Sequence, residues 1–107
     1  MNYPQYNQFQ QPQIQQPKLQ LMNKGFGIDQ NEYNTITTSC MNAYAYKQYP
    51  MSTTAANNIK RTIGGEWFIC SSPVDKKDFD FSLTTAKTED SLVFSVDNIL
   101  FQVCRLK

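Results

Sequence analysis

The sequence contains no histidine, no long apolar run and no excess of either charge. Without histidine, neither a Ser–His nor a Cys–His nucleophile nor a histidine-ligated metal site can be assembled. The 10 basic and 9 acidic residues leave a formal net charge of +1, which gives no electrostatic reason to expect nucleic acid or an acidic membrane as the main partner. The composition therefore predicts a protein that is not an enzyme and that uses no metal, no cofactor and no small-molecule substrate.

No stretch approaches the apolar length of a membrane span, and the first residues are rich in glutamine rather than forming a charged and then apolar leader. We therefore expect a soluble, intracellular protein with no membrane partner. The cysteines agree with this expectation, because Cys40, Cys70 and Cys104 are odd in number and widely separated. Such a set is a poor disulfide framework and predicts reduced thiols among core residues.

The N-terminal part of the chain differs in composition from the rest. Residues 1–24 hold eight Gln, three Asn and three Pro and no acidic residue, with Tyr3, Tyr6 and Phe9 spaced between them. Such a segment buries too little apolar surface to offset the entropy of ordering it. We predict a disordered arm over residues 1–27 and a folded domain over residues 28–107. The arm is either a passive tail or a segment for self-association or docking on a large partner.

Two helices are predicted at the start of the folded domain. From Asp29 to about Lys47, apolar residues recur at helical spacing, and Tyr49-Pro50 then ends the helix, because the residue before proline avoids the helical region. The second helix is expected to begin at an N-cap on Ser52 or Thr53 and to end at Gly64-Gly65. Its predicted apolar stripe consists of Ala55, Ala56, Ile59 and Ile63.

Four strands are predicted after the helices, over residues 66–70, 79–85, 92–96 and 99–103. The last two are rich in β-branched and aromatic residues and flank Asp97-Asn98, a pair that tolerates the positive φ of a two-residue hairpin turn. Residues 79–85 alternate apolar with polar side chains, as a strand with one wet face does. The predicted fold class is α+β, with two helices packed on an antiparallel sheet of four to five strands.

In the order and spacing of these segments, the chain resembles the eight-kilodalton dynein light chains over residues 29–107. Residues 49–63, YPMSTTAANNIKRTI, are similar to the second helix of that family, with its Ala-Ala-x-Ile-Lys-Lys core. Trp67-Phe68 falls where the family has a Trp-His pair, and residues 91–107 match its closing hairpin without gaps. The resemblance implies a non-catalytic, strand-swapped dimer in which one strand crosses to the partner and short peptides add as a further strand.

The resemblance also implies which residues contact the partners. The crossing strand would be residues 79–85, in which Thr84 matches a peptide-contacting threonine of the family. The implied peptide-binding residues are Thr53, Thr54, Phe81, Ser82, Leu83, Thr84, Thr85, Val93 and Ser95. The implied dimer interface includes Trp67, Phe68 and Phe79.

Several positions depart from the family pattern. Phe68 replaces the interface histidine, which predicts an association that is more apolar and less sensitive to pH. Thr53 replaces a lysine that grips the peptide, and Ser91, Val93 and Ser95 replace an aromatic groove lining. We interpret these changes as adaptation to a specialised partner.

The resulting hypothesis is a dimeric dynein light chain that binds intermediate chains of a dynein motor, as a homodimer or as a heterodimer with a related light chain. Its expected location is the cytoplasm and cytoskeleton, in particular the cilium axoneme. The alternative hypothesis is a peptide-binding dimerisation adaptor that works outside any motor. A third possibility, a condensate or nucleic-acid protein driven by the arm, is disfavoured by the near-neutral charge.

Overall fold

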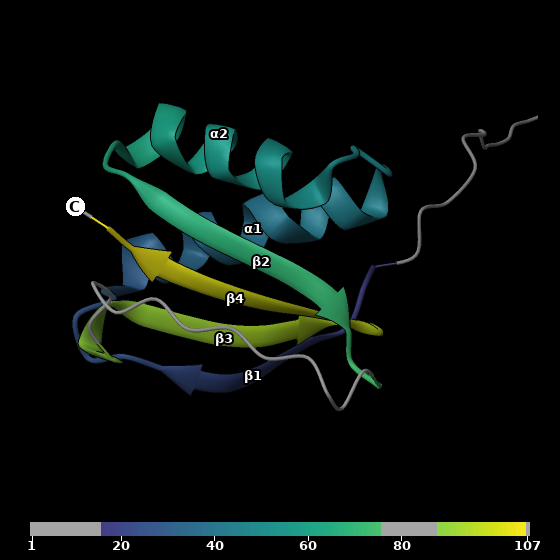
Figure 1. Cartoon of the computed structure of the whole chain (residues 1–107), viewed down its shortest axis with the longest axis horizontal. Helices are drawn as coiled ribbons and strands as arrows, with labels where there is room; N and C mark the ends of the chain where they lie inside the picture. Colours follow the sequence, from purple (N-terminus) through teal and green to yellow (C-terminus); the bar gives the residue numbers. More distant parts are fainter. Residues whose placement is uncertain (1–15, 76–87, 107) are drawn as a thin grey trace, which may run out of the picture.

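The computed structural model describes residues 16–75 and 88–106, which form one helical layer on one antiparallel sheet (Figure 1). The sheet has four strands in the order β1-β3-β4-β2, so β1 and β2 are its two edges. The elements are β1 Leu19–Lys24, α1 Gln30–Ala45, α2 Met51–Ile63, β2 Trp67–Pro73, the 3-10 turn η2 Thr88–Asp90, β3 Ser91–Val96 and β4 Ile99–Arg105. This confirms the predicted α+β class with two helices packed on an antiparallel sheet.

Both helices pack on the same face of the sheet. The core joins residues from both helices to alternate residues of β3 and β4, whose other side chains point to the opposite face. Its fully buried members are Ile36, Cys40, Ala55, Ile59, Leu92, Phe94, Val96, Phe101 and Val103. The rings of Phe94 and Phe101 stack at its centre, with centroids 5.6 Å apart.

α1 begins with a capping box that the sequence contains in full. The Asp29 side chain accepts a hydrogen bond from the Glu32 amide, and the Glu32 side chain accepts one from the Asp29 amide. The β-branched Thr37 fits within the helix because its hydroxyl donates to the Tyr33 carbonyl, at 2.8 Å. The helix ends at Ala45, two residues before the predicted end.

The predicted N-cap of α2 is wrong. The helix starts at Met51 with Pro50 at the cap position, and no side chain caps it. Ser52 instead lies in the first turn, where its hydroxyl is 2.9 Å from the Ser71 hydroxyl of β2. This hydrogen bond links the first turn of α2 to β2. The predicted stop at Gly64 is confirmed, because Gly64 has φ of 76° and its amide donates to the Lys60 carbonyl.

The strands agree with the prediction at three of the four expected places. β3 and β4 cover the segments predicted at 92–96 and 99–103, and β2 begins one residue after the start of the segment predicted at 66–70 and ends three residues beyond it. Asp97, with φ of 53°, opens the turn between β3 and β4. The segment predicted at 79–85 lies outside the described residues.

The prediction of a disordered arm over residues 1–27 is wrong for residues 19–24. These residues form β1, which pairs with β3 and has an irregular register between Leu21 and Asn23. Five of the six β1 residues are exposed and the sixth is half-buried, so backbone pairing rather than apolar burial holds the strand in place. Leu19 packs against the core, but Leu21 and Met22 are largely exposed, so the apolar residues of this segment were too few to predict the strand. Residues 1–15 lie outside the described part of the chain.

The cysteines are free in the described part of the chain. Cys40 is buried in the core, as predicted, whereas Cys104 is buried on the face of the sheet away from the helices and Cys70 is half-buried on the edge strand β2. Burial raises the pKa of both Cys40 and Cys70, because it disfavours the thiolate.

None of the described helices combines the length and the apolar character needed to cross a bilayer.

Candidate protein-binding surface

The face of the sheet opposite the helices carries no charged residue on β2, β3 or β4. Strand register places alternate residues of the three strands on this side, and we name this set the helix-free face. Its members are Phe68, Cys70, Ser72, Ser91, Val93, Ser95, Leu100, Gln102 and Cys104. Depletion of charge together with apolar and aromatic side chains is typical of the centre of a protein–protein interface.

The second feature is the outer edge of β2. This strand pairs with β4 along its whole length, and no described strand lies along its other side. An edge strand presents backbone N–H and C=O groups that another strand can pair with. α2 packs beside β2, and the Ser52–Ser71 contact joins the two elements near the start of the helix. This edge therefore has the geometry required for strand addition next to a helix.

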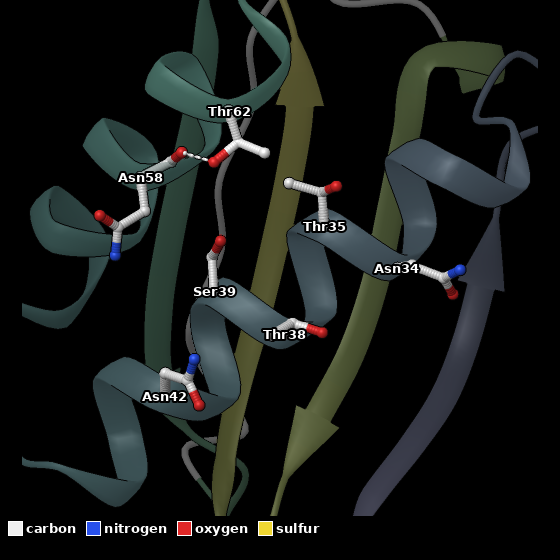
Figure 2. Close-up of a pocket in the computed structure, with 7 residues that line it drawn as sticks. All are labelled: Asn34, Thr35, Thr38, Ser39, Asn42, Asn58 and Thr62. Atoms are coloured by element: carbon white, nitrogen blue, oxygen red, sulfur yellow. Dashed lines mark hydrogen bonds between the residues drawn. The ribbon is translucent and has the colours of Figure 1, made fainter.

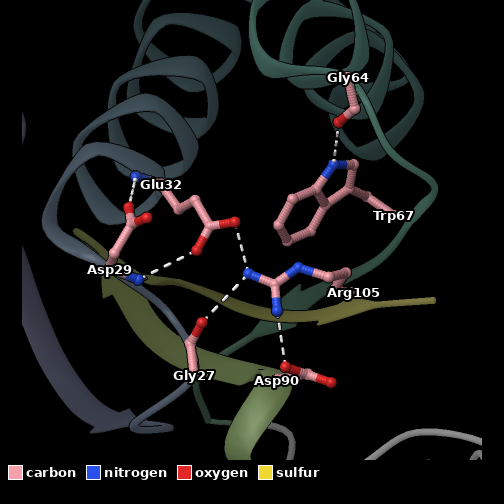
Figure 3. A network of polar contacts seen from close by, with 7 residues as sticks. All are labelled: Gly27, Asp29, Glu32, Gly64, Trp67, Asp90 and Arg105. Atoms are coloured by element: carbon pink, nitrogen blue, oxygen red, sulfur yellow. Dashed lines mark hydrogen bonds and ion pairs between the residues drawn. The ribbon is translucent and has the colours of Figure 1, made fainter. Parts of the chain in front are cut away.

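A cluster around Arg105 fixes the opposite end of β2 and β4 (Figure 3). The Arg105 guanidinium lies 2.6 Å from Asp90 Oδ1 and 2.5 Å from Glu32 Oε2, and it also donates to the Gly27 carbonyl. The guanidinium carbon of Arg105, Cζ, lies 5.2 Å from the ring centroid of Trp67, which is a cation–π distance. Single-sequence patterns do not indicate this cluster, because Arg105 and Glu32 are 73 residues apart.

Trp67 and Phe68, both predicted at the dimer interface, point to opposite faces of the sheet. Trp67 lies on the helix side, where its Nε1 donates to the Gly64 carbonyl at 2.8 Å and Arg105 covers its ring (Figure 3). Phe68 lies on the helix-free face, opposite Cys104 in the register. Trp67 and Phe68 therefore do not share one surface of this chain. Phe79, the third predicted residue, lies outside the described residues.

The predicted peptide-binding residues do not form one surface within a single chain. Val93 and Ser95 lie on the helix-free face, and Ser95 is buried. Thr53 and Thr54 lie in the first turn of α2, on the other side of the sheet. Ser52, from the same turn, contacts Ser71 of β2, whereas the sequence interpretation considered it only as a helix cap. The remaining predicted residues, Phe81, Ser82, Leu83, Thr84 and Thr85, lie outside the described part of the chain.

Comparison with known proteins adds no relative, because no protein-family model and no curated protein sequence matches the chain.

Proposed function

We propose that this chain is a non-catalytic dimeric protein of the dynein light chain type, which binds and stabilises intermediate-chain segments of a dynein motor by β-strand addition. The proposed setting is an axonemal dynein of the cilium. The partner chain is either a second copy or a related light chain.

The observation that carries this proposal is the position of β2. β2 is an edge strand and lies beside α2. Between the last residue of β2 and the first residue of β3, the next described strand along the chain, lie 17 residues. A connection of that length is far longer than a hairpin loop and is long enough to include a strand that crosses to a partner. Strand addition at the β2 edge would satisfy backbone groups that β4 does not reach.

The helix-free face supports the dimer. It is uncharged on three strands, and its apolar members Phe68, Val93 and Leu100 are half-buried within the single chain. Packing the face against a second copy would bury the area that these side chains still expose without isolating a charge. A two-fold axis through such a face places the same patch on both chains and creates two equivalent β2 edges. Two equivalent sites give a bivalent partner an avidity gain.

Sedimentation velocity of the full chain tests the dimer. Replacement Phe68→Asp would bury a carboxylate at the proposed interface, and we expect it to convert dimers into monomers at micromolar concentration. The matched control is Tyr49→Asp, which places the same charge at an exposed aromatic residue on the α1–α2 connection and should leave the dimer intact. A parent chain that sediments as a monomer, or a dimeric Phe68→Asp variant, contradicts the proposed interface.

Cross-linking of the full chain purified from its own cells tests the partner. The proposal expects cross-links from Lys60, on α2 beside β2, to a dynein intermediate chain. Cross-links to peptide partners in preparations free of dynein heavy and intermediate chains would contradict it. They would instead favour a dimerisation adaptor that works outside any motor.

A further inference from the structure

A polar groove lies between α1 and α2 on the helical layer (Figure 2). Its volume is about 410 Å³, which is within the range of pockets that hold small molecules. The described residues that line it are Asn34, Thr35, Thr38, Ser39, Asn42, Asn58 and Thr62. Since all of them are Asn, Thr or Ser, this lining offers hydrogen bonds but no formal charge and no aromatic ring.

Ser39 is a buried member of this lining whose hydroxyl is unpaired. The residue is only 8% exposed, and its hydroxyl makes no hydrogen bond to any residue in the described ranges. Thr37, two residues earlier, donates instead to the Tyr33 carbonyl. Figure 2 shows the Ser39 side chain directed from α1 toward the side of α2 that carries Asn58 and Thr62. Because an unpaired buried hydroxyl is costly, a ligand that pairs with Ser39 lowers the free energy.

The free hydrogen-bonding capacity of the asparagines consists mostly of donors. Asn34 Oδ1 accepts a hydrogen bond from Gln30, and Asn58 Oδ1 accepts one from Arg61. Their side-chain nitrogens, and the whole side-chain amide of Asn42, bond to no residue in the described part of the chain. The threonine and serine hydroxyls of the lining can donate or accept. This combination matches a ligand that presents several uncharged oxygen atoms.

The lining also selects against charged and apolar ligands. Arg61 contacts Asn58 but does not line the groove, and it is exposed to solvent. An anion in the groove would lose hydration without meeting a cation on the lining, and a cation would meet no carboxylate there. An apolar ligand would cover the amides and hydroxyls without pairing them. The expected ligand is therefore neutral and polar over its whole surface.

We propose that this groove binds a neutral saccharide unit. A saccharide ring carries oxygen atoms around its whole edge, so it accepts from the asparagine amides and donates to hydroxyl oxygens at the same time. An extended peptide fits less well, because the backbones of α1 and α2 pair within each helix and leave few groups for strand-like pairing. The saccharide is bound and not transformed, because Asn, Ser and Thr do not titrate as acids or bases near neutral pH.

This site is separate from the proposed dimer. The groove lies on the helical layer, whereas the helix-free face lies on the other side of the sheet. Saccharide binding and dimer formation can therefore succeed or fail independently of each other.

Chemical-shift titration of the ¹⁵N-labelled full chain tests the proposal. The probes are glucose, galactose, mannose and N-acetylglucosamine, each added to about 100 mM because a neutral monosaccharide is a weak ligand. We expect at least one of them to cause saturable shifts of the Ser39 and Asn42 amides and of the Asn58 side-chain amide. Cyclohexanol, a ring of similar size with a single hydroxyl, should cause none. The absence of a saturable shift with every sugar, or equal shifts with cyclohexanol, would overturn the proposal.

Two arginine variants of α2 test the location. Thr62 and Asn57 are both exposed, but only Thr62 lines the groove. Thr62→Arg should fill the groove and abolish the shifts caused by the sugar, whereas Asn57→Arg should retain them. Loss of binding in both variants, or in neither, would contradict the assignment to this groove.

The variant Ser39→Ala tests the buried hydroxyl. Affinity for the sugar should fall about five- to tenfold, because the variant loses one hydrogen bond to the ligand. In the absence of sugar, the midpoint of urea unfolding should stay the same or rise, because the variant removes an unpaired hydroxyl. Unchanged affinity, or a lower midpoint, would contradict the role of Ser39.

The methyl glycoside of the sugar that binds distinguishes the two sources of such a unit. Retained binding indicates a sugar linked within a glycan, because the anomeric oxygen then tolerates a substituent. Lost binding indicates a free monosaccharide, because the site then requires the anomeric hydroxyl.

Discussion

At the scale of single residues, Arg105 connects segments that are far apart in the sequence. It joins β4 to the first turn of α1 through Glu32, to η2 through Asp90 and to the β1–α1 connection through the Gly27 carbonyl. Its side chain is 21% exposed and those of its two carboxylate partners 20% and 23%, so solvent screens these ion pairs less than surface pairs.

Replacement Arg105→Gln should lower the free energy of unfolding by about 2 to 4 kcal/mol, because it leaves two partly buried carboxylates without a cation. Urea unfolding followed by Trp67 fluorescence measures this change. The control is Lys60→Gln, which removes an ion pair to Glu66 whose side chains are 60% and 54% exposed. That pair should contribute less than about 1 kcal/mol. Equal losses in both variants would contradict the structural role of the Arg105 cluster.

A second residue-scale prediction concerns Cys40, which is fully buried in the core. Burial raises its pKa above the ordinary value of 9.0, so above pH 9 the unfolded chain loses this proton before the folded chain does. Cys40 therefore contributes stability that is complete below pH 9 and declines at higher pH, by at most about 1.4 kcal/mol per pH unit.

Comparison of the parent with Cys40→Ala isolates this effect, because Cys70 and Tyr44 titrate in both chains. At pH 7 the variant should be less stable by about 1 kcal/mol, through the lost core contacts. The difference should shrink above pH 9 and reverse sign by pH 10.5, because the parent by then loses about 2 kcal/mol. Urea unfolding at each pH measures it, and a constant difference would contradict the prediction.

At the scale of elements, the end of β1 packs very closely on η2. The Gly25 amide donates to the Ser91 carbonyl and the Gly27 amide to the Glu89 carbonyl, each at 2.8 Å. A Cβ on Gly25 would lie 2.4 Å from the Glu89 carbonyl oxygen, which belongs to the backbone and cannot move aside. Glycine is therefore required here for close approach.

Gly25→Ala should destabilise the chain by about 1 to 3 kcal/mol, because the added methyl group forces β1 away from η2. Hydrogen exchange should show faster exchange of the β1 amides, with β4 much less affected. The control is Phe26→Ser at the next residue, which is 88% exposed and should change stability by less than about 0.5 kcal/mol. Unchanged exchange in Gly25→Ala would contradict this account of β1.

At the scale of the whole molecule, the absence of histidine bears on the proposed dimer. Phe68 stands on the helix-free face, where a titrating histidine would loosen association on protonation. We expect the dimer dissociation constant to change less than about threefold between pH 7.5 and pH 6, since no side chain in the chain has an ordinary pKa in this range. Sedimentation equilibrium at both values measures it. A Phe68→His variant should instead dissociate more at pH 6, and equal behaviour of the two chains would contradict the argument.

Local sequence signals predicted most of the elements correctly. The helical spacing from Asp29, the glycine stop of α2 and the Asp97-Asn98 turn each depend on residues within a few positions of one another. The β-branched and aromatic composition of 92–96 and 99–103 predicted the two strands of the hairpin, β3 and β4. β1 was not predictable in this way, because pairing with β3 decides it, and the start of α2 has no side-chain cap that a local pattern could indicate.

The sequence by itself determined the two helices, the closing hairpin and the exclusion of histidine chemistry, because propensity, capping and periodicity act between near neighbours. Only the tertiary structure decided that β1 joins the sheet, that β2 is an edge and that Arg105 reaches Glu32. Each of these facts depends on contacts between residues distant along the chain, whose formation depends on how the whole domain packs.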